Sequence, residues 1–314
     1  MDDEVLLEYS TEFTVNTPTI RESELRPLIQ LLDDTDTTVT TAVQSKLISY
    51  GSVVVPILRE VMAREADLVP ADESTPTLIN AQACIRALQT EALAEVMNEI
   101  FDSKAAEREI DLEKVCIGIS RFGCPEVDAA SLLEVFDTLA LRVHKHVVDT
   151  KNVNELTLLM CLNTVFFEQE LYRGATANYY SPEHSYLANV IRSKRGIPLS
   201  LSLVYLLVAE RVGIELHGVG MPLHFLVYHP VLNVYIDTFN QGAFLSREDC
   251  EKFVRQSGFS FQEGMLGRAT NMMIIQRLLR NLVYAHTKCR QTWDSEVLQE
   301  TLDEIIRLDK SGLV

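Results

Sequence analysis

Apolar residues recur at helical spacing through much of the chain. Between Leu25 and Leu32 they follow the i, i+3, i+4, i+7 pattern of one helix face. An Asp-rich turn then predicts the start of a second helix that runs through Leu47, and Gly51 predicts its end. A third helix is expected over 54–63. Short helices joined by an Asp-rich turn are typical of HEAT-type repeats, so a helical, HEAT-like module is expected over 1–110.

The same periodicity predicts helices further along the chain. They are expected over residues 77–101, 105–118, 127–148, 153–171, 200–211 and 246–256, and as a helical hairpin over 268–309. The hairpin turn is expected near 290–294. The helix over 200–211 is almost wholly apolar and ends at Gly213, which predicts that it is buried.

The apolar period changes from 3.6 to 2 in the middle of the chain. IELHGVGMPLHFLVYH (214–229) and NVYIDTF (233–239) alternate and are rich in β-branched and aromatic residues, which predicts one antiparallel pair of strands. A hairpin loop over 229–232 pairs Tyr228 with Asn233 and sets His224 opposite Asp237. A carboxylate in that place holds an imidazole in one tautomer, as a catalytic triad requires. The alternative is an unrelated His and Asp in a hairpin.

Composition indicates a globular protein with an acidic first half. Of the 314 residues, 47% are hydrophobic and 23% charged, and the formal net charge is −17. Residues 1–150 hold 12 basic and 28 acidic side chains, a balance of −16, which leaves −1 for the remainder. A nucleic-acid surface is therefore not expected on the first half. An acidic face for solubility and a docking surface for a basic partner both stay open.

Targeting and redox signals favour the cytoplasm. No run reaches the length of about 18 apolar residues that predicts a membrane helix, and the N-terminus is acidic where a signal peptide is basic. The six cysteines have no paired spacing, which favours reduced thiols over a disulfide framework or zinc module. His144 and His146 are two apart on an expected helix, so their rings diverge. No metal or cofactor is expected.

Ser200 stands where a turn leads into the apolar helix, in GIPLSLSLVYLLVA (196–209). Three interpretations stay open for its hydroxyl. It caps the helix, it caps the helix and also contacts a substrate or partner, or it is a nucleophile. No Glu or Gln follows three residues later, so a capping box is not expected.

An ordered set of motifs carries a family resemblance. The set is Y-x-x-P-x-x-S (179–185), R-G-I-P-x-S-L (195–201), P-x-H-F-L-V (222–227) and I-D-x-F-N (236–240). Together with its flanks, this region resembles the transglutaminase-like core of SirB-type bacterial proteins over about 190 residues. The downstream helical hairpin is similar to their tetratricopeptide-like tail. The first 110 residues lie outside the resemblance.

The resemblance implies a papain-like arrangement with a Cys at the start of the central helix and a His and an Asp on adjacent strands. His224 and Asp237 fall on the His and Asp positions, whereas the Cys position falls at or next to Ser200. No cysteine lies between Cys161 and Cys250, so the thiol is missing. A serine hydroxyl does not form the stable ion pair of a thiolate with an imidazole.

These observations predict a helix-rich α+β fold. We expect a helical module over 1–110, a transglutaminase-like core with a small antiparallel sheet over 111–262, and a tetratricopeptide-like hairpin over 263–314. Asn240, His184 and Tyr180 are expected to line the cleft. The expected function is a non-catalytic binding or scaffold module for a protein or peptide. The alternative is a hydrolase or acyl-transferase of peptide or amide bonds that uses Ser200, His224 and Asp237.

Overall fold

The computed structural model describes residues 22–70, 73–148, 150 and 152–310. Its N-terminal helices are α1 (Glu22–Gln30), α2 (Thr37–Ile48), α3 (Val54–Ala66) and α4 (Pro76–Ala105). The central helices are α5 (Leu112–Gly123), α6 (Ala129–Val148), α7 (Glu155–Asn163), α8 (Leu187–Ser193) and α9 (Pro198–Val212). The last helices are α10 (Arg247–Gln256), α11 (Asn271–Lys288) and α12 (Thr292–Lys310). A π-helical turn, Thr164–Gln169, extends α7.

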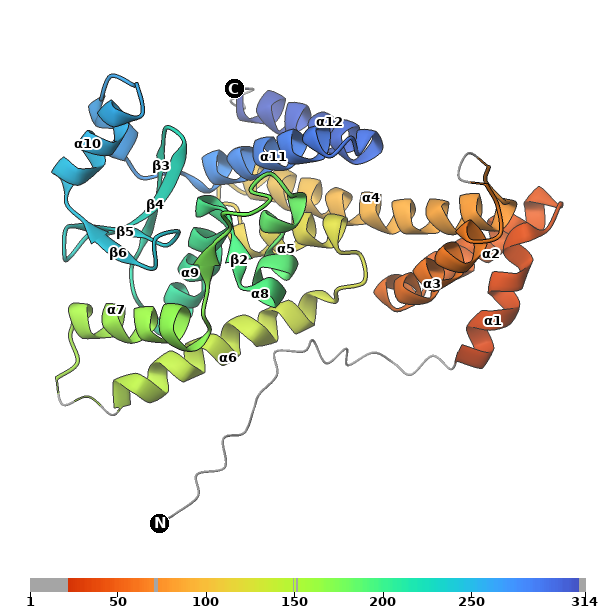
Figure 1. The fold of residues 1–314 in the computed structure, drawn as a ribbon, viewed down its shortest axis with the longest axis horizontal. Coiled ribbons are helices and arrows are strands. Elements are labelled where there is room, and N and C mark those ends of the chain that lie inside the picture. Colours follow the sequence, from red (N-terminus) through yellow and green to blue (C-terminus); the bar gives the residue numbers. More distant parts are fainter. Residues whose placement is uncertain (1–21, 71–72, 149, 151, 311–314) are drawn as a thin grey trace, which may run out of the picture.

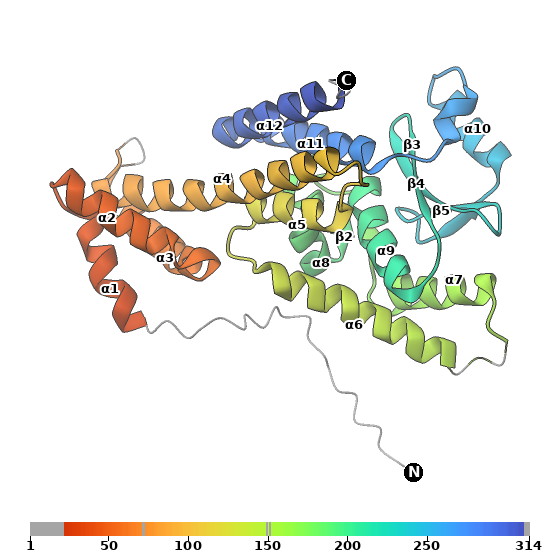
Figure 2. The same cartoon turned by 180° about the vertical axis from the view of Figure 1, so that it is seen from behind.

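The long helix α4 joins two hydrophobic clusters. Its first half packs with α1, α2 and α3 through Ala81 and Ile85, and its second half enters the main core through Val96 and Ile100. Figure 1 shows α4 running from the α1–α3 group to the rest of the molecule, and Figure 2 shows the same arrangement from behind. The clusters therefore divide within α4, before the boundary expected at residue 110.

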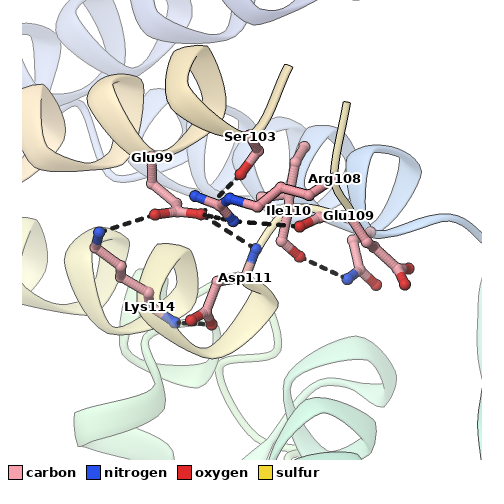
Figure 3. Close-up of polar contacts among 8 residues, drawn as sticks. Glu99, Ser103, Arg108, Glu109, Ile110, Asp111 and Lys114 are labelled. Carbon is pink, nitrogen blue, oxygen red and sulfur yellow. Dashed lines mark hydrogen bonds and ion pairs between the residues drawn. The ribbon is translucent and has the colours of Figure 1, made fainter. Parts of the chain in front are cut away.

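The turn between α4 and α5 is held by a buried carboxylate. Glu99 is only 2% exposed and contacts the guanidinium of Arg108 at 2.7 Å and the ammonium of Lys114 at 2.8 Å. The hydroxyl of Ser103 donates to the same carboxylate at 2.7 Å (Figure 3). The hydrogen bond from Arg108 is the main reason that the pKa of Glu99 lies well below its usual value, although burial opposes the shift.

The C-terminal hairpin shares the main core with the central helices. Leu278 and Leu282 of α11 and Leu298 and Ile305 of α12 belong to the same apolar cluster as the buried face of α9. In both views the α11–α12 hairpin lies beside α4 and α5 (Figure 1, Figure 2). The hairpin is therefore packed as part of the central body.

The main sheet has four antiparallel strands in sequence order. They are β3 (His217–Met221), β4 (His224–His229), β5 (Val234–Asp237) and β6 (Ala243–Leu245). The two expected segments do pair antiparallel, as β4 and β5. The expectation of a single strand over 214–229 was wrong, because a tight turn separates β3 from β4 and pairs Met221 with His224. Pro222 and Leu223 form this turn, with Leu223 at a φ of 60°. A fixed-φ residue followed by a left-handed one is the geometry of a tight turn.

A second, two-stranded parallel pairing leads into the central helix. Its strands are β1 (Arg173–Gly174) and β2 (Arg195–Gly196). Helix α9 begins directly after β2 at Pro198 and ends at Gly213, whose φ is +84°. A proline in the first turn and a left-handed glycine after the last one are the expected limits of such a helix.

Candidate functional site

His224 and Asp237 lie together at one end of the main sheet. His224 begins β4 and Asp237 ends β5, and the Nε2 atom of the imidazole is 2.9 Å from the Oδ2 atom of the carboxylate. Both are buried, with exposures of 8% and 5%. The expected register was wrong by two residues, because Tyr228 pairs with Tyr235 and not with Asn233. A shift of two keeps both side chains on the same face, so they meet along a diagonal.

The carboxylate of Asp237 is fully engaged. Its Oδ1 accepts from the backbone N–H groups of Phe239 and Asn240, both at 3.1 Å, and its Oδ2 accepts from the side-chain amide of Asn240 at 2.7 Å. Burial alone would raise the pKa of Asp237, but the hydrogen bond and charge of His224 and the bonds from Asn240 outweigh it and lower the pKa. An ionised Asp237 accepts the Nε2 proton, which leaves Nδ1 of His224 as an acceptor.

Ser200 lies in the first turn of α9, but it is not the N-cap. The N-cap is Ile197, so the capping interpretation of Ser200 was wrong. Its hydroxyl is fully buried and donates to the carbonyl of His184 at 2.6 Å, with the carbonyl of Ile197 at 3.2 Å. Gly196 is packed against this hydroxyl, since a Cβ atom there would lie 2.7 Å from it. The described residues therefore show no hydrogen bond between the Ser200 hydroxyl and His224.

Ser202 faces a different neighbour from Ser200. Its hydroxyl shares a hydrogen bond of 2.8 Å with the hydroxyl of Thr238, the residue after Asp237. Both hydroxyls are buried. This bond ties the end of β5 to α9, so it helps to fix where the Asp237 carboxylate lies.

A cavity of about 500 Å³ lies in front of His224. Its walls come from the Tyr-Tyr-Ser-Pro loop, the start of α9, the β3–β4 turn and α11. They are formed by Tyr179, Tyr180, Ser181, Ser185, Ile197, Pro198, Leu199, Leu223, His224, Phe225, Arg277, Asn281, Tyr284 and Ala285. Leu199, not Ser200, is the residue of the first helical turn that lines this cavity beside Pro198.

The three residues expected to line the cleft are placed differently. Tyr180 lines the cavity and is 55% exposed. Asn240 is exposed and does not line the cavity, and its side-chain amide donates to Asp237. His184 contributes its backbone carbonyl to Ser200, and both ring nitrogens are buried without a hydrogen-bond partner among the described residues. Burial lowers the pKa of His184, which favours the neutral ring.

Arg277 is a wall residue that the sequence did not indicate. Its Nη1 donates to the carbonyl of Met221 at 3.0 Å and its Nη2 to the carbonyl of His224 at 2.7 Å. The guanidinium carbon lies 5.6 Å from the centre of the Phe225 ring. Burial lowers the pKa of Arg277. One signal was present, because Arg277, Asn281 and Tyr284 follow the i, i+4, i+7 spacing of a single helix face.

No metal centre is found within the described ranges. No group of three or more His, Cys, Asp or Glu side chains there has the geometry to hold a metal ion. His146 is instead hydrogen-bonded to Gln169 at 2.6 Å. All six cysteines are free, and five are buried. Burial raises the pKa of Cys250 to about 12, so this thiol is protonated at neutral pH.

A larger surface groove of about 960 Å³ lies away from His224. It is bounded by the α4–α5 turn, the end of α9 and the start of β3. Several acidic side chains line it, among them Glu109, Glu113 and Glu215. Arg268, Arg211 and His217 pair with these three in turn.

In the described part of the chain no helix is long and apolar enough to cross a membrane.

Comparisons with known proteins identify a domain type that spans these residues. A family described as "Transglutaminase-like superfamily" matches residues 130–280, a span that includes His224, Asp237 and Arg277. A UPF0162 protein of Xylella fastidiosa (strain 9a5c) is 32% identical over 213 residues, covering 63% of this chain and 72% of that protein. A UPF0162 protein of Pseudomonas aeruginosa is 36% identical over 109 residues, covering 34% of this chain and 40% of that protein.

A eukaryotic relative shares a segment that makes up a smaller part of its own length. "F-box only protein 21" of Mus musculus is 28% identical over 156 residues, which is 46% of this chain and 24% of that protein. The search of solved structures found no significant match.

Proposed function

The chain belongs to the UPF0162 family and carries a transglutaminase-like domain, and from this premise we propose that it is a non-catalytic binding module. The cavity at His224 is its binding site for a segment of a protein or peptide. The observation that carries this proposal is the position of the Ser200 hydroxyl, 2.6 Å from the carbonyl of His184. A nucleophile must lie within hydrogen-bond reach of its base, and this hydroxyl is committed elsewhere.

At the start of α9 the cavity is lined by Ile197, Pro198 and Leu199, and none of these side chains has a nucleophilic atom. We infer that Leu199 and Ser200 together occupy the place of the cysteine that the family resemblance implies. The start of α9 then provides the His224–Asp237 pair with no thiol and no free hydroxyl to activate. Its remaining role is recognition, since a fixed imidazole presents Nδ1 as an acceptor for an N–H or O–H group of a ligand.

Two observations favour a protein or peptide as the ligand. Tyr180 and Tyr284 lie at the cavity with exposures of 55% and 47%, and exposed aromatic side chains are typical of protein-binding surfaces. The similar segment makes up only 24% of the mouse F-box only protein 21, so the domain is combined there with other sequence.

The tetratricopeptide-like character of the α11–α12 hairpin and the SirB-type assignment stay predictions. We also place the protein in a reducing compartment such as the cytoplasm, because all six cysteines are free.

The second candidate is a Ser-His-Asp hydrolase or acyl-transferase acting on peptide or amide bonds. The 2.9 Å contact between His224 and Asp237 favours it, because that pair has the geometry of a base and its orienting carboxylate. In this alternative the hydroxyl of Ser200 leaves the carbonyl of His184 and turns toward Nδ1 of His224.

Labelling with a serine-reactive fluorophosphonate separates the two candidates. The full chain is compared with Ser200→Ala, and with Ser202→Ala as a matched variant whose hydroxyl also lies in α9. The binding-module proposal expects no labelling that depends on Ser200. Labelling of the native protein that is lost in Ser200→Ala and kept in Ser202→Ala would establish the hydrolase and overturn the proposal.

A further inference from the structure

We propose that the cavity at His224 recognises a carboxylate, and that Arg277 is the residue that binds it. The inference rests on the proposed binding function and names the chemistry of the ligand. The carboxylate belongs either to the C-terminal end of a peptide or to an acidic side chain within one. Its neighbouring apolar side chain lies against the aromatic residues of the cavity.

The charge of the cavity wall differs from that of the whole protein. The chain has a net charge of −17, yet no Asp or Glu is among the residues that line the cavity. Arg277 is the one side chain in that wall with a permanent charge. Asp237 lies behind His224, and its oxygens are engaged by His224, Phe239 and Asn240. An anion that enters the cavity therefore meets one positively charged side chain, Arg277, and no carboxylate in the wall.

The guanidinium of Arg277 has unused donors. Two of its five N–H groups are committed to the carbonyls of Met221 and His224, and these bonds fix its orientation. It forms no ion pair with a carboxylate in the described part of the chain. A partly buried cation without a counter-ion is costly, and a planar guanidinium matches the two oxygens of a carboxylate. A ligand carboxylate supplies the missing counter-ion.

Neighbouring polar groups complete a site for such an anion. The side chain of Asn281, one turn after Arg277, lines the same cavity and has no hydrogen-bond partner among residues 152–310 or elsewhere in the described chain. The hydroxyl of Ser185 also lines the cavity, is only 3% exposed as a residue, and likewise has no described partner. Both groups are hydrogen-bond donors for a carboxylate held by Arg277.

The mouth of the cavity provides the apolar contact. The rings of Tyr180 and Tyr284 are in edge contact, with centroids 5.3 Å apart, and Leu223 is 70% exposed beside them. Leu223 holds the left-handed conformation of the β3–β4 turn, which Arg277 fixes through the carbonyl of Met221. The anion site and the apolar rim are thus positioned by the same hydrogen bonds.

Peptide pools test the inference directly. The immobilised full chain is offered random hexapeptides with a free C-terminal carboxylate, the same pool amidated, and an amidated pool made without Asp or Glu. We expect the last pool to be retained at least about tenfold less than the first. Loss on amidation alone identifies the chain end as the source. Retention of amidated peptides rich in Asp or Glu identifies an acidic side chain.

Two further outcomes overturn different claims. Equal retention of the pool that lacks all carboxylates overturns the carboxylate inference but leaves the binding function standing. Retention of none of the three pools contradicts the binding function itself, and the inference with it. The failures are therefore distinguishable.

Variants on one helix provide the matched controls. Arg277→Gln is expected to weaken binding of a selected peptide by about tenfold or more, and Asn281→Ala by severalfold. Arg280→Gln removes the same charge from the exposed side of α11, where Arg280 bonds to Gln276 at 3.1 Å, and is expected to leave binding unchanged. Arg277→Gln also removes hydrogen bonds to the β3–β4 turn, so this variant can fail to fold. In that case the binding measured with Asn281→Ala tests the site. An Asn281→Ala variant that binds normally would count against the site.

Discussion

The Nε2 atom of His224 lies 2.9 Å from the Oδ2 atom of Asp237, although the two residues are not paired across the sheet. Side chains two positions off register remain on one face of a sheet, and a long imidazole reaches across the diagonal. Asn240 completes the arrangement, because it holds the same carboxylate from the residues after β5. The result is an imidazole of fixed orientation in the wall of the cavity. Leu199, in the first turn of α9, lines the same cavity.

Asp237→Asn is expected to destabilise the protein by about 1–3 kcal/mol. The amide replaces an acceptor-only carboxylate that receives bonds from two backbone N–H groups, from Asn240 and from His224, and so leaves buried donors without partners. Urea unfolding measures the change. Asp303→Asn is the control, because Asp303 is exposed and bonds only to Gln299 among the described residues. Equal stability of the two variants would contradict a structural role for Asp237.

Glu99→Gln is expected to lower the free energy of unfolding at pH 7 by about 1–3 kcal/mol, because the bonds of Arg108 and Lys114 to a charged acceptor are lost. The pKa of Glu99 is lowered in the folded protein, so its contribution is complete above the ordinary value of 4.5 and is lost as the pH falls. The variant should therefore lose less stability than the native protein between pH 6 and pH 3. The exposed Glu91→Gln, on the same helix, should match the native protein at every pH.

His286 is expected to make the protein less stable in mild acid. Its Nε2 atom is 2.7 Å from the hydroxyl of Tyr186, and its Nδ1 atom is buried without a partner among the described residues. Burial lowers the pKa of His286 below its ordinary value of 6.5, so the stability that it contributes is complete above that value and is lost as the pH falls.

The free energy of unfolding, measured at pH 7.5 and pH 5.5, checks this expectation. His286→Gln should show a smaller decrease than the native protein, while the exposed His144→Gln should show the same decrease as the native protein. An unchanged decrease in His286→Gln would show that other groups cause the acid sensitivity. His184 and His229 are the first candidates, because burial lowers the pKa of each.

Local patterns predicted most of the helices and the neighbourhood of the site, because those features depend on nearby residues. Helix α8 was missed, and the helix expected over 105–118 begins only at Leu112. The helical spacing from Leu25 to Leu32 and the stop at Gly213 are properties of a few successive positions. The two-residue period placed His224 and Asp237 on one face even with the register wrong. The β3–β4 turn was missed, because Pro222 and Leu223 carry none of the glycine or asparagine that usually marks a left-handed turn position.

Long-range contacts decided what the sequence did not predict. Arg277 reaches the carbonyl of His224, which lies 53 residues earlier, and no local pattern indicates that contact. The direction of the Ser200 hydroxyl depends on the carbonyl of His184, which the loop before α8 brings to the first turn of α9. The sequence placed a serine near the site, but the packing of that loop determines that the Ser200 hydroxyl bonds to the carbonyl of His184.

Cysteine reactivity tests most directly whether the position facing His224 is Leu199 or Ser200. Leu199→Cys and Ser200→Cys are each made together with Cys289→Ser, which removes the exposed native thiol. The alkylation rate with iodoacetamide is then measured from pH 5 to pH 9. A thiol in the cavity, beside an imidazole and a helix N-terminus, ionises below its usual pKa of about 8.5. We predict that Leu199→Cys reacts at least about tenfold faster at neutral pH, and that Ser200→Cys is slow. Fast reaction of Ser200→Cys with an inert Leu199→Cys would contradict the account, because it would place the hydroxyl of Ser200 at the His224–Asp237 pair.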